Sequence, residues 1–259
     1  MEEVFILELT WGIGLLAIVG GLLSGFMNSI VGGGGMISLP IYMMMGLPTT
    51  MALGSNKVSS LMGSTVSSLA FIRNGKVNRH LMTRFIPLSF IGSICGVALA
   101  MVLPSDFLRT LVIVLLFGVC LLTIFKKDWG TYSTYRPLTG VMFFAGCVAT
   151  FIFGFYDGFF GPGVGTFLIF AFLLIGCDFI EAAGNAQVLN WASNLAAAIA
   201  FIYFGAVDWS LALLMGAAQI VGSLIGTRLA ILKGASWVRP IFLTVSVLLI
   251  GRQLWTLFH

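Results

Sequence analysis

The chain has 259 residues, of which 59% are hydrophobic and 8% are charged, and its mean hydropathy is +1.08. Because an ordinary soluble domain is about a quarter charged, this composition excludes a water-soluble protein and predicts one that lies in lipid. Four cysteines without a C-x-x-C pair and two histidines argue against a disulfide framework, a zinc site or another metal centre, and we expect no cofactor. The formal net charge of +4 indicates membrane topology rather than nucleic-acid binding.

Eight segments are apolar over about 20 residues, the length that a helix needs to cross the hydrocarbon core of a bilayer. They cover approximately residues 9–31, 49–72, 82–103, 107–125, 137–160, 178–204, 209–230 and 237–257. Two shorter apolar stretches, 36–46 and 166–176, each follow a glycine-rich break. We therefore expect an all-α polytopic membrane protein with eight full transmembrane helices and two short half-helices.

The second half of the sequence repeats the first at an offset of 129 or 130 residues. Matching positions include Gly25 and Gly154, Gly54 and Gly184, Gly75 and Gly205, Gly92 and Gly222, and Gly96 and Gly226. The repeat predicts a first half over residues 1–128, a cytoplasmic linker over 129–136 and a second half over 137–259. We expect the halves to form one transmembrane domain, because neither buries its own polar positions.

The charges of the loops predict that the two halves have opposite orientations. The loop after the segment 49–72 is rich in basic residues, whereas its counterpart in the second half contains Asp208 and no base. By the positive-inside rule, the first loop is cytoplasmic and the second is not. This pattern indicates an inverted-topology repeat, a construction found in secondary transporters whose site lies at the membrane midplane between broken helices.

Lys57 is the polar residue that the sequence places deepest in the membrane. It lies eight residues after Thr49, a candidate N-cap, and therefore about 12 Å along the helix axis. This depth is close to the middle of a hydrocarbon core about 30 Å thick. A lysine at that depth faces water, an ionic partner or a bound anion. The alternatives are that it extends to the interface or pairs with an acidic residue.

Two polar stripes extend this feature and predict one shared site. The spacing i, i+3, i+7 places three residues on one helical face in each half. The stripes are Lys57, Ser60 and Ser64 in the first half and Gln187, Asn190 and Asn194 in the second, and Asn56 broadens the first. For the serines and Asn194, hydrogen bonding between helices is an equally good interpretation.

The glycine breaks, Gly32 to Gly35 and Gly161 to Gly165, supply a second kind of anion-binding group. A backbone without side chains lets successive N–H groups converge on an anion beside a helix N-terminus. Neither break fits a phosphate-binding loop or a dinucleotide motif. Asp157, just before the second break, is predicted to cap exposed N–H groups or to bind and release a proton. Asp178 with Glu181 indicates a capping box without a substrate role.

Several ordered motifs resemble those of the TauE/SafE sulfite exporter family of bacterial membrane permeases, over nearly the whole chain. They are GFMNSIVGGGGMISLP from residue 25, LGSNKVSS from 53, GFYDGFFGPGVGTF from 154 and QVLNWASN from 187. The resemblance implies transport of small sulfur-containing anions, such as sulfite, sulfoacetate and other organosulfonates, across the bacterial cytoplasmic membrane. Residues matching its motifs include Gly33, Gly34, Asn56, Lys57, Asp157, Gly161, Gly163, Asn190 and Asn194. Asn28 stands where an acid is equally familiar, which argues against coupling to two protons.

The resulting prediction is a secondary transporter that works by alternating access and uses no enzymatic chemistry. The predicted substrate-binding residues are Gly33, Gly34, Asn56, Lys57, Ser60, Gly161, Pro162, Gly163, Gln187, Asn190 and Asn194, with Asp157 as the proton-coupling candidate. An uncoupled anion channel and a structural membrane protein remain alternatives. An intramembrane enzyme would need a metal cluster or a nucleophile with a base, and the apolar segments contain no convincing pair.

Overall fold

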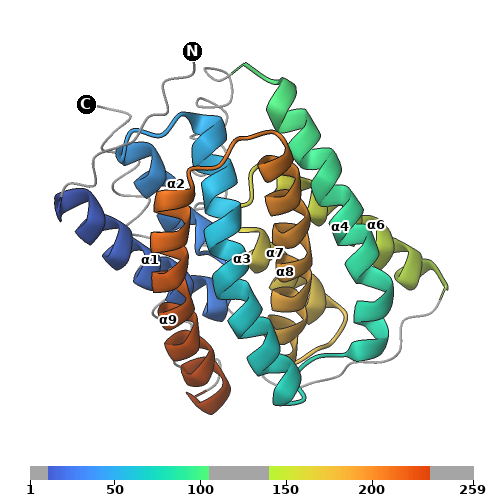
Figure 1. Cartoon of the computed structure of the whole chain (residues 1–259). Helices are drawn as coiled ribbons and strands as arrows, with labels where there is room; N and C mark the ends of the chain where they lie inside the picture. Colours follow the sequence, from blue (N-terminus) through green and yellow to red (C-terminus); the bar gives the residue numbers. More distant parts are fainter. Residues whose placement is uncertain (1–10, 105–139, 234–259) are drawn as a thin grey trace, which may run out of the picture.

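The computed structural model describes residues 11–104 and 140–233, which form helices and contain no strand (Figure 1). In chain order the helices are α1 (Trp11–Val31), α2 (Gly35–Met44), α3 (Thr49–Arg73), α4 (Arg79–Val102), α6 (Gly140–Phe159), α7 (Val164–Leu174), α8 (Phe179–Tyr203) and α9 (Trp209–Lys233). Six of the eight predicted long segments and both predicted half-helices are therefore present as helices. The predicted segments 107–125 and 237–257 and the predicted linker 129–136 lie outside the described residues.

Among the long helices, α3 and α8 carry more polar side chains than α1, α4, α6 and α9. Among the described helices, α1, α4, α6 and α9 are long and apolar enough to cross a membrane. Helices α3 and α8 have 25 residues each but carry many serine, asparagine and glutamine side chains, most of them buried. Polar side chains thus face the interior of the bundle, as expected where the outer surface meets lipid.

Closely packed glycines join the apolar helices in pairs. Gly92 of α4 lies against α6, where a Cβ atom on it would be 2.3 Å from the carbonyl oxygen of Phe151. Gly222 of α9 lies against α1 in the same way, with 2.1 Å to the carbonyl oxygen of Leu22. These glycines therefore allow the close packing of neighbouring membrane helices.

Other contacts also recur at the offset of the sequence repeat. The backbone N–H of Asn78 donates to Asn185 Oδ1 at 2.8 Å, and the N–H of Asp208 donates to Ser55 Oγ at 2.8 Å. Asn78 and Asp208 are 130 positions apart, as are Ser55 and Asn185. Asn78 and Asp208 each also accept a hydrogen bond from the first turn of the helix that follows. The first half of the chain therefore contacts the second through matched interactions.

The two glycine breaks touch each other in the interior. A Cβ atom on Gly32 would lie 2.2 Å from the Cα atom of Gly165, and Gly32 has a positive φ of 70°. Gly35 packs in turn on Pro162. The expected role of the glycine run in anion binding is therefore incomplete, because Gly32 is also required for this contact between backbones.

Two predictions about helix starts have different outcomes. Helix α3 begins at Thr49, but Pro48 occupies the N-cap position and no side chain caps the helix, so the predicted Thr49 cap is wrong. The fixed φ of proline already suits the residue that starts a helix. Asp178 does cap α8, because its Oδ1 accepts from the N–H groups of Ile180 and Glu181 at 2.8 Å each.

Candidate functional site

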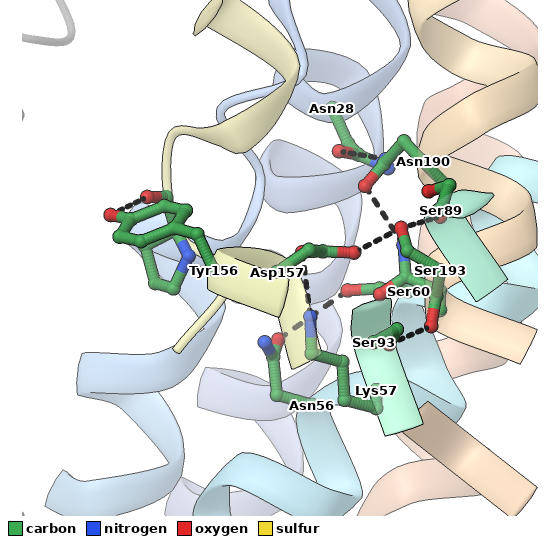
Figure 2. Close-up of polar contacts among 12 residues, drawn as sticks. Asn28, Asn56, Lys57, Ser60, Ser89, Ser93, Tyr156, Asp157, Asn190 and Ser193 are labelled. Atoms are coloured by element: carbon green, nitrogen blue, oxygen red, sulfur yellow. Dashed lines mark hydrogen bonds and ion pairs between the residues drawn. The ribbon is translucent and has the colours of Figure 1, made fainter. Parts of the chain in front are cut away.

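An ion pair between the two halves lies in the buried interior. Lys57 Nζ on α3 is 2.7 Å from Asp157 Oδ1 on α6, and each side chain is 2% exposed. Figure 2 shows the two side chains facing each other. Lys57 is therefore buried inside the helix bundle, and the acidic partner that was considered as an alternative is present. Removing one member of such a pair leaves an uncompensated charge, at a cost of about 3–5 kcal/mol.

The second oxygen of Asp157 also has a partner. Ser193 Oγ on α8 donates to Asp157 Oδ2 and lies 3.1 Å from the carbonyl oxygen of Asn190. The backbone carbonyl of Ser193 accepts from Ser93 Oγ on α4 at 2.7 Å. Within the described residues, no backbone N–H donates to the Asp157 carboxylate. The prediction that Asp157 caps the glycine break is therefore wrong, because the carboxylate is occupied by Lys57 and Ser193.

The second glycine break lies directly against the ion pair. A Cβ atom on Gly161 would be 2.5 Å from Lys57 Nζ and 3.1 Å from Asp157 Oδ1. The hydroxyl of Tyr156 donates to the carbonyl oxygen of Pro162 at 2.9 Å, which holds the break against the end of α6. The structure therefore brings Lys57, Asp157 and Gly161 together, as a shared site requires.

An uncharged counterpart of the ion pair lies between α1 and α8. Gln187 Nε2 donates to the backbone carbonyl oxygen of Asn28, and Asn190 Nδ2 donates to Asn28 Oδ1 at 3.3 Å. Asn28 precedes Asp157 by 129 positions, and Lys57 precedes Gln187 by 130. The two halves thus meet at a pair of a lysine and a carboxylate and, at the equivalent positions, at a pair of amide residues.

Backbone N–H groups at both breaks have no hydrogen-bond partner among the described residues. They include those of Gly33 and Gly34 in the first break and of Gly163 and Gly165 in the second. A Cβ atom on Gly34 would lie 2.6 Å from the Cβ atom of Asn28, so the first break adjoins the amide pair. Unpaired N–H groups beside the start of a short helix favour bound oxygen atoms.

The remaining predicted site residues connect the site to neighbouring helices. Asn56 Oδ1 accepts from Ser38 Oγ on α2 at 2.5 Å and from Ser60 Oγ at 3.4 Å. Asn194 Nδ2 donates to Asn190 Oδ1 at 3.0 Å. Among the residues that the structure describes, Ser64 Oγ bonds only to the carbonyl oxygen of Leu61 in its own helix, 3.2 Å away.

Sequence reasoning missed Ser193 as a member of this network. Ser193 lies three positions after Asn190 on α8 and therefore on the same polar face, so the helical spacing was a usable signal. Asn28 was recognised only as the neutral equivalent of Asp157. In the two described stretches, no three His, Cys, Asp or Glu side chains are grouped so that they could hold a metal ion.

The apolar helices around this buried polar centre define the class of protein: an integral membrane protein. The chain belongs to the sulfite exporter TauE/SafE family, whose model matches residues 17–252, and with its bacterial relatives this indicates the bacterial plasma membrane. It is 36% identical to a probable membrane transporter protein, ORF9, of Sinorhizobium sp. over 91% of this chain and 90% of that one. It is 32% identical to a probable membrane transporter protein of Haemophilus influenzae, over 94% of this chain and 96% of the relative. No solved structure matches significantly.

Proposed function

We propose that the protein is a secondary transporter of small sulfur-containing anions, such as sulfite, sulfoacetate or other organosulfonates, across the cytoplasmic membrane. The family description names a sulfite exporter, and the relatives are named as probable membrane transporters, which supports both the activity and the class of substrate. The observation that carries the proposal for this chain is the buried ion pair of Lys57 and Asp157. A lysine at this depth is a binding group for an anion once its carboxylate partner is neutralised.

The ion pair suggests how substrate binding is coupled to a proton. When Asp157 is ionised, its carboxylate forms an ion pair with Lys57. An incoming anion would then add an uncompensated negative charge to a site of low dielectric constant. Protonation of Asp157 removes that competition and leaves Lys57 to balance the anion. One proton therefore accompanies one monovalent anion, and the net charge of the site stays unchanged.

Alternating access requires that the two halves move against each other, and the proposed inverted repeats supply that arrangement. The contacts that recur at an offset of 130 residues support a structural repeat. The opposite charge of the equivalent loops supports the inversion. Both central pairs cross between the halves: Lys57 with Asp157, and Gln187 with Asn28. If contacts to the bound substrate replace these contacts between the halves, the two halves can move relative to each other.

Counterflow in proteoliposomes tests the proposal. Vesicles loaded with unlabelled sulfite or sulfoacetate should accumulate the same labelled anion transiently with the wild-type protein. Lys57→Met should weaken substrate binding by about a hundredfold, because the positive charge is lost. Lys76→Met removes a lysine outside the ion pair and serves as the matched control with unchanged counterflow.

The alternatives predict other results in the same vesicles. Anion flux without saturation or counterflow would indicate an uncoupled channel. Absence of flux for both anions, with correctly folded protein, would favour a structural role. Normal counterflow in Lys57→Met would remove the lysine from the proposed site.

A further inference from the structure

Two buried side-chain atoms beside the first glycine break have no hydrogen-bond partner among the described residues. They are Asn28 Nδ2 and Gln187 Oε1, on residues that are 4% and 2% exposed. A buried donor or acceptor without a partner is unfavourable, and native proteins satisfy almost all of them. The pair therefore points to a ligand group that the described residues do not supply.

The surrounding hydrogen bonds fix which atom of each amide is left over. Asn194 Nδ2 donates to Asn190 Oδ1, and Asn190 Nδ2 donates to Asn28 Oδ1. The amides of α8 thus form a chain that ends on Asn28 with its Nδ2 donor unused. Gln187 directs its Nε2 at the backbone carbonyl oxygen of Asn28, so that its Oε1 acceptor is unused. A reversed Gln187 amide would place its Oε1 against the carbonyl oxygen of Asn28, and a reversed Asn28 amide would place two NH2 donors against each other.

The residues that carry these two atoms, Asn28 and Gln187, are connected to the ion pair by hydrogen bonds. Ser193 Oγ lies within hydrogen-bond distance of both the Asn190 carbonyl oxygen and the Asp157 carboxylate. In Figure 2, Asn28, Asn190, Ser193 and Asp157 follow one another in space, and Lys57 lies next to Asp157. A charged binding group and a neutral one are therefore connected by one hydrogen-bonded network.

We propose that Asn28 and Gln187 bind a hydroxyl group of the substrate while Lys57 binds its sulfonate group. A hydroxyl oxygen accepts from Asn28 Nδ2, and its hydrogen donates to Gln187 Oε1, so that both unused atoms gain a partner. A sulfonate oxygen alone satisfies only the donor. The preferred substrates are thus small organosulfonates that carry a hydroxyl group. This inference rests on the proposed transport function and names the substrate subclass.

A matched pair of probes tests the inference with purified full-length protein. Ethanesulfonate and 2-hydroxyethanesulfonate, which differ in one hydroxyl group, are compared as competitors of labelled sulfite or sulfoacetate. The wild-type protein should bind the hydroxylated probe about tenfold more tightly, the effect of about one good hydrogen-bonded group. Asn28→Leu and Gln187→Met should each reduce this ratio to about one.

Gln219→Met is the matched control. Gln219 on α9 is also fully buried, donates from Nε2 to Ser59 Oγ at 3.1 Å and leaves Oε1 without a described partner, but it has no contact with Asn28 or Lys57 among its described hydrogen bonds. Its replacement should leave the tenfold ratio unchanged. A ratio of one in the wild type would mean that water fills the amide site and would overturn the inference alone.

The variants give a second decisive result. A ratio that stays at ten in both Asn28→Leu and Gln187→Met would also overturn the inference. If neither labelled anion binds the wild-type protein, the proposed function fails and the inference fails with it.

Discussion

At the scale of single residues, Lys57 shows what a sequence can and cannot specify. Its depth follows from its distance along one helix, because the rise per residue is constant. Its partner Asp157 is 100 positions away, and spacing within a helix carries no information about which neighbouring helix it faces. The acid was identified as a functional candidate, but its ion pair with Lys57 required the fold.

Reversing the ion pair tests whether it stabilises the fold. Each single variant, Lys57→Asp or Asp157→Lys, places two like charges together in the interior and should destabilise the protein by about 3–5 kcal/mol. The double variant should recover a substantial part of this loss, because opposite charges face each other again. Thermal unfolding in detergent measures all three. A double variant no more stable than the worse single variant would contradict the pairing.

Removing the acid alone tests proton coupling. In the proposed cycle a proton on Asp157 frees Lys57, so substrate binding to the wild type should weaken as the pH rises. Asp157→Asn should bind the anion with little dependence on pH, because the competing carboxylate is absent. Equilibrium binding of labelled sulfoacetate across a series of pH values measures this. Parallel pH profiles would exclude Asp157 as the coupling residue.

Cys177 lies between α7 and α8, outside the helices, in a small pocket that also includes Lys76 and Asn185. Burial first, and then the carboxylates of Glu181 and Asp178, raise the pKa of its thiol to about 12. Because the thiolate is the reactive form, Cys177 should react slowly with maleimide at pH 7. A cysteine introduced by His80→Cys at an exposed position should react quickly. Equal rates would contradict this environment.

At the scale of helices, the existence and length of each helix were predicted more successfully than the contacts between helices. Both half-helices and six long helices were found near their predicted bounds, because apolar length and glycine breaks are local features of the sequence. The predicted cap of α3 and the predicted capping role of Asp157 were wrong, because Pro48 at the N-cap has no side-chain acceptor and Lys57 pairs with the Asp157 carboxylate. Which residues meet depends on helix crossings, and these are set by small residues on both partners.

The crossing of α4 and α6 gives a prediction of its own. Gly92→Ala introduces a Cβ atom 2.3 Å from the carbonyl oxygen of Phe151, so that the helices must separate, at a cost of about 1–3 kcal/mol. Gly12→Ala near the start of α1 meets no atom within 4 Å and is the matched control without loss. Thermal unfolding of both variants in detergent compares them. An equally stable Gly92→Ala variant would show that the crossing tolerates a wider separation.

At the scale of the whole molecule, the opposite orientation of the halves is the central expectation. Loop charges predict it, and the recurring contacts between the halves agree with a repeat. The sequence alone could not show that the two glycine breaks meet through Gly32 and Gly165. This contact joins residues in different halves of the chain and involves no side chain.

Orientation can be measured with single introduced cysteines, after the four native cysteines have been replaced. A membrane-impermeant maleimide should label His80→Cys only from the cytoplasmic side and Ser210→Cys only from the opposite side. Inside-out and right-side-out vesicles provide the two exposures. Labelling of both positions from the same side would contradict an inverted repeat.

The unequal chemistry of the two central pairs has a consequence for direction. A lysine and a carboxylate join α3 to α6, whereas amide groups alone join α8 to α1. In the proposed alternating-access cycle, opening toward one side would separate charges and opening toward the other would separate dipoles. The two resting conformations would then differ in energy, and the inward and outward turnover rates at equal gradients would differ.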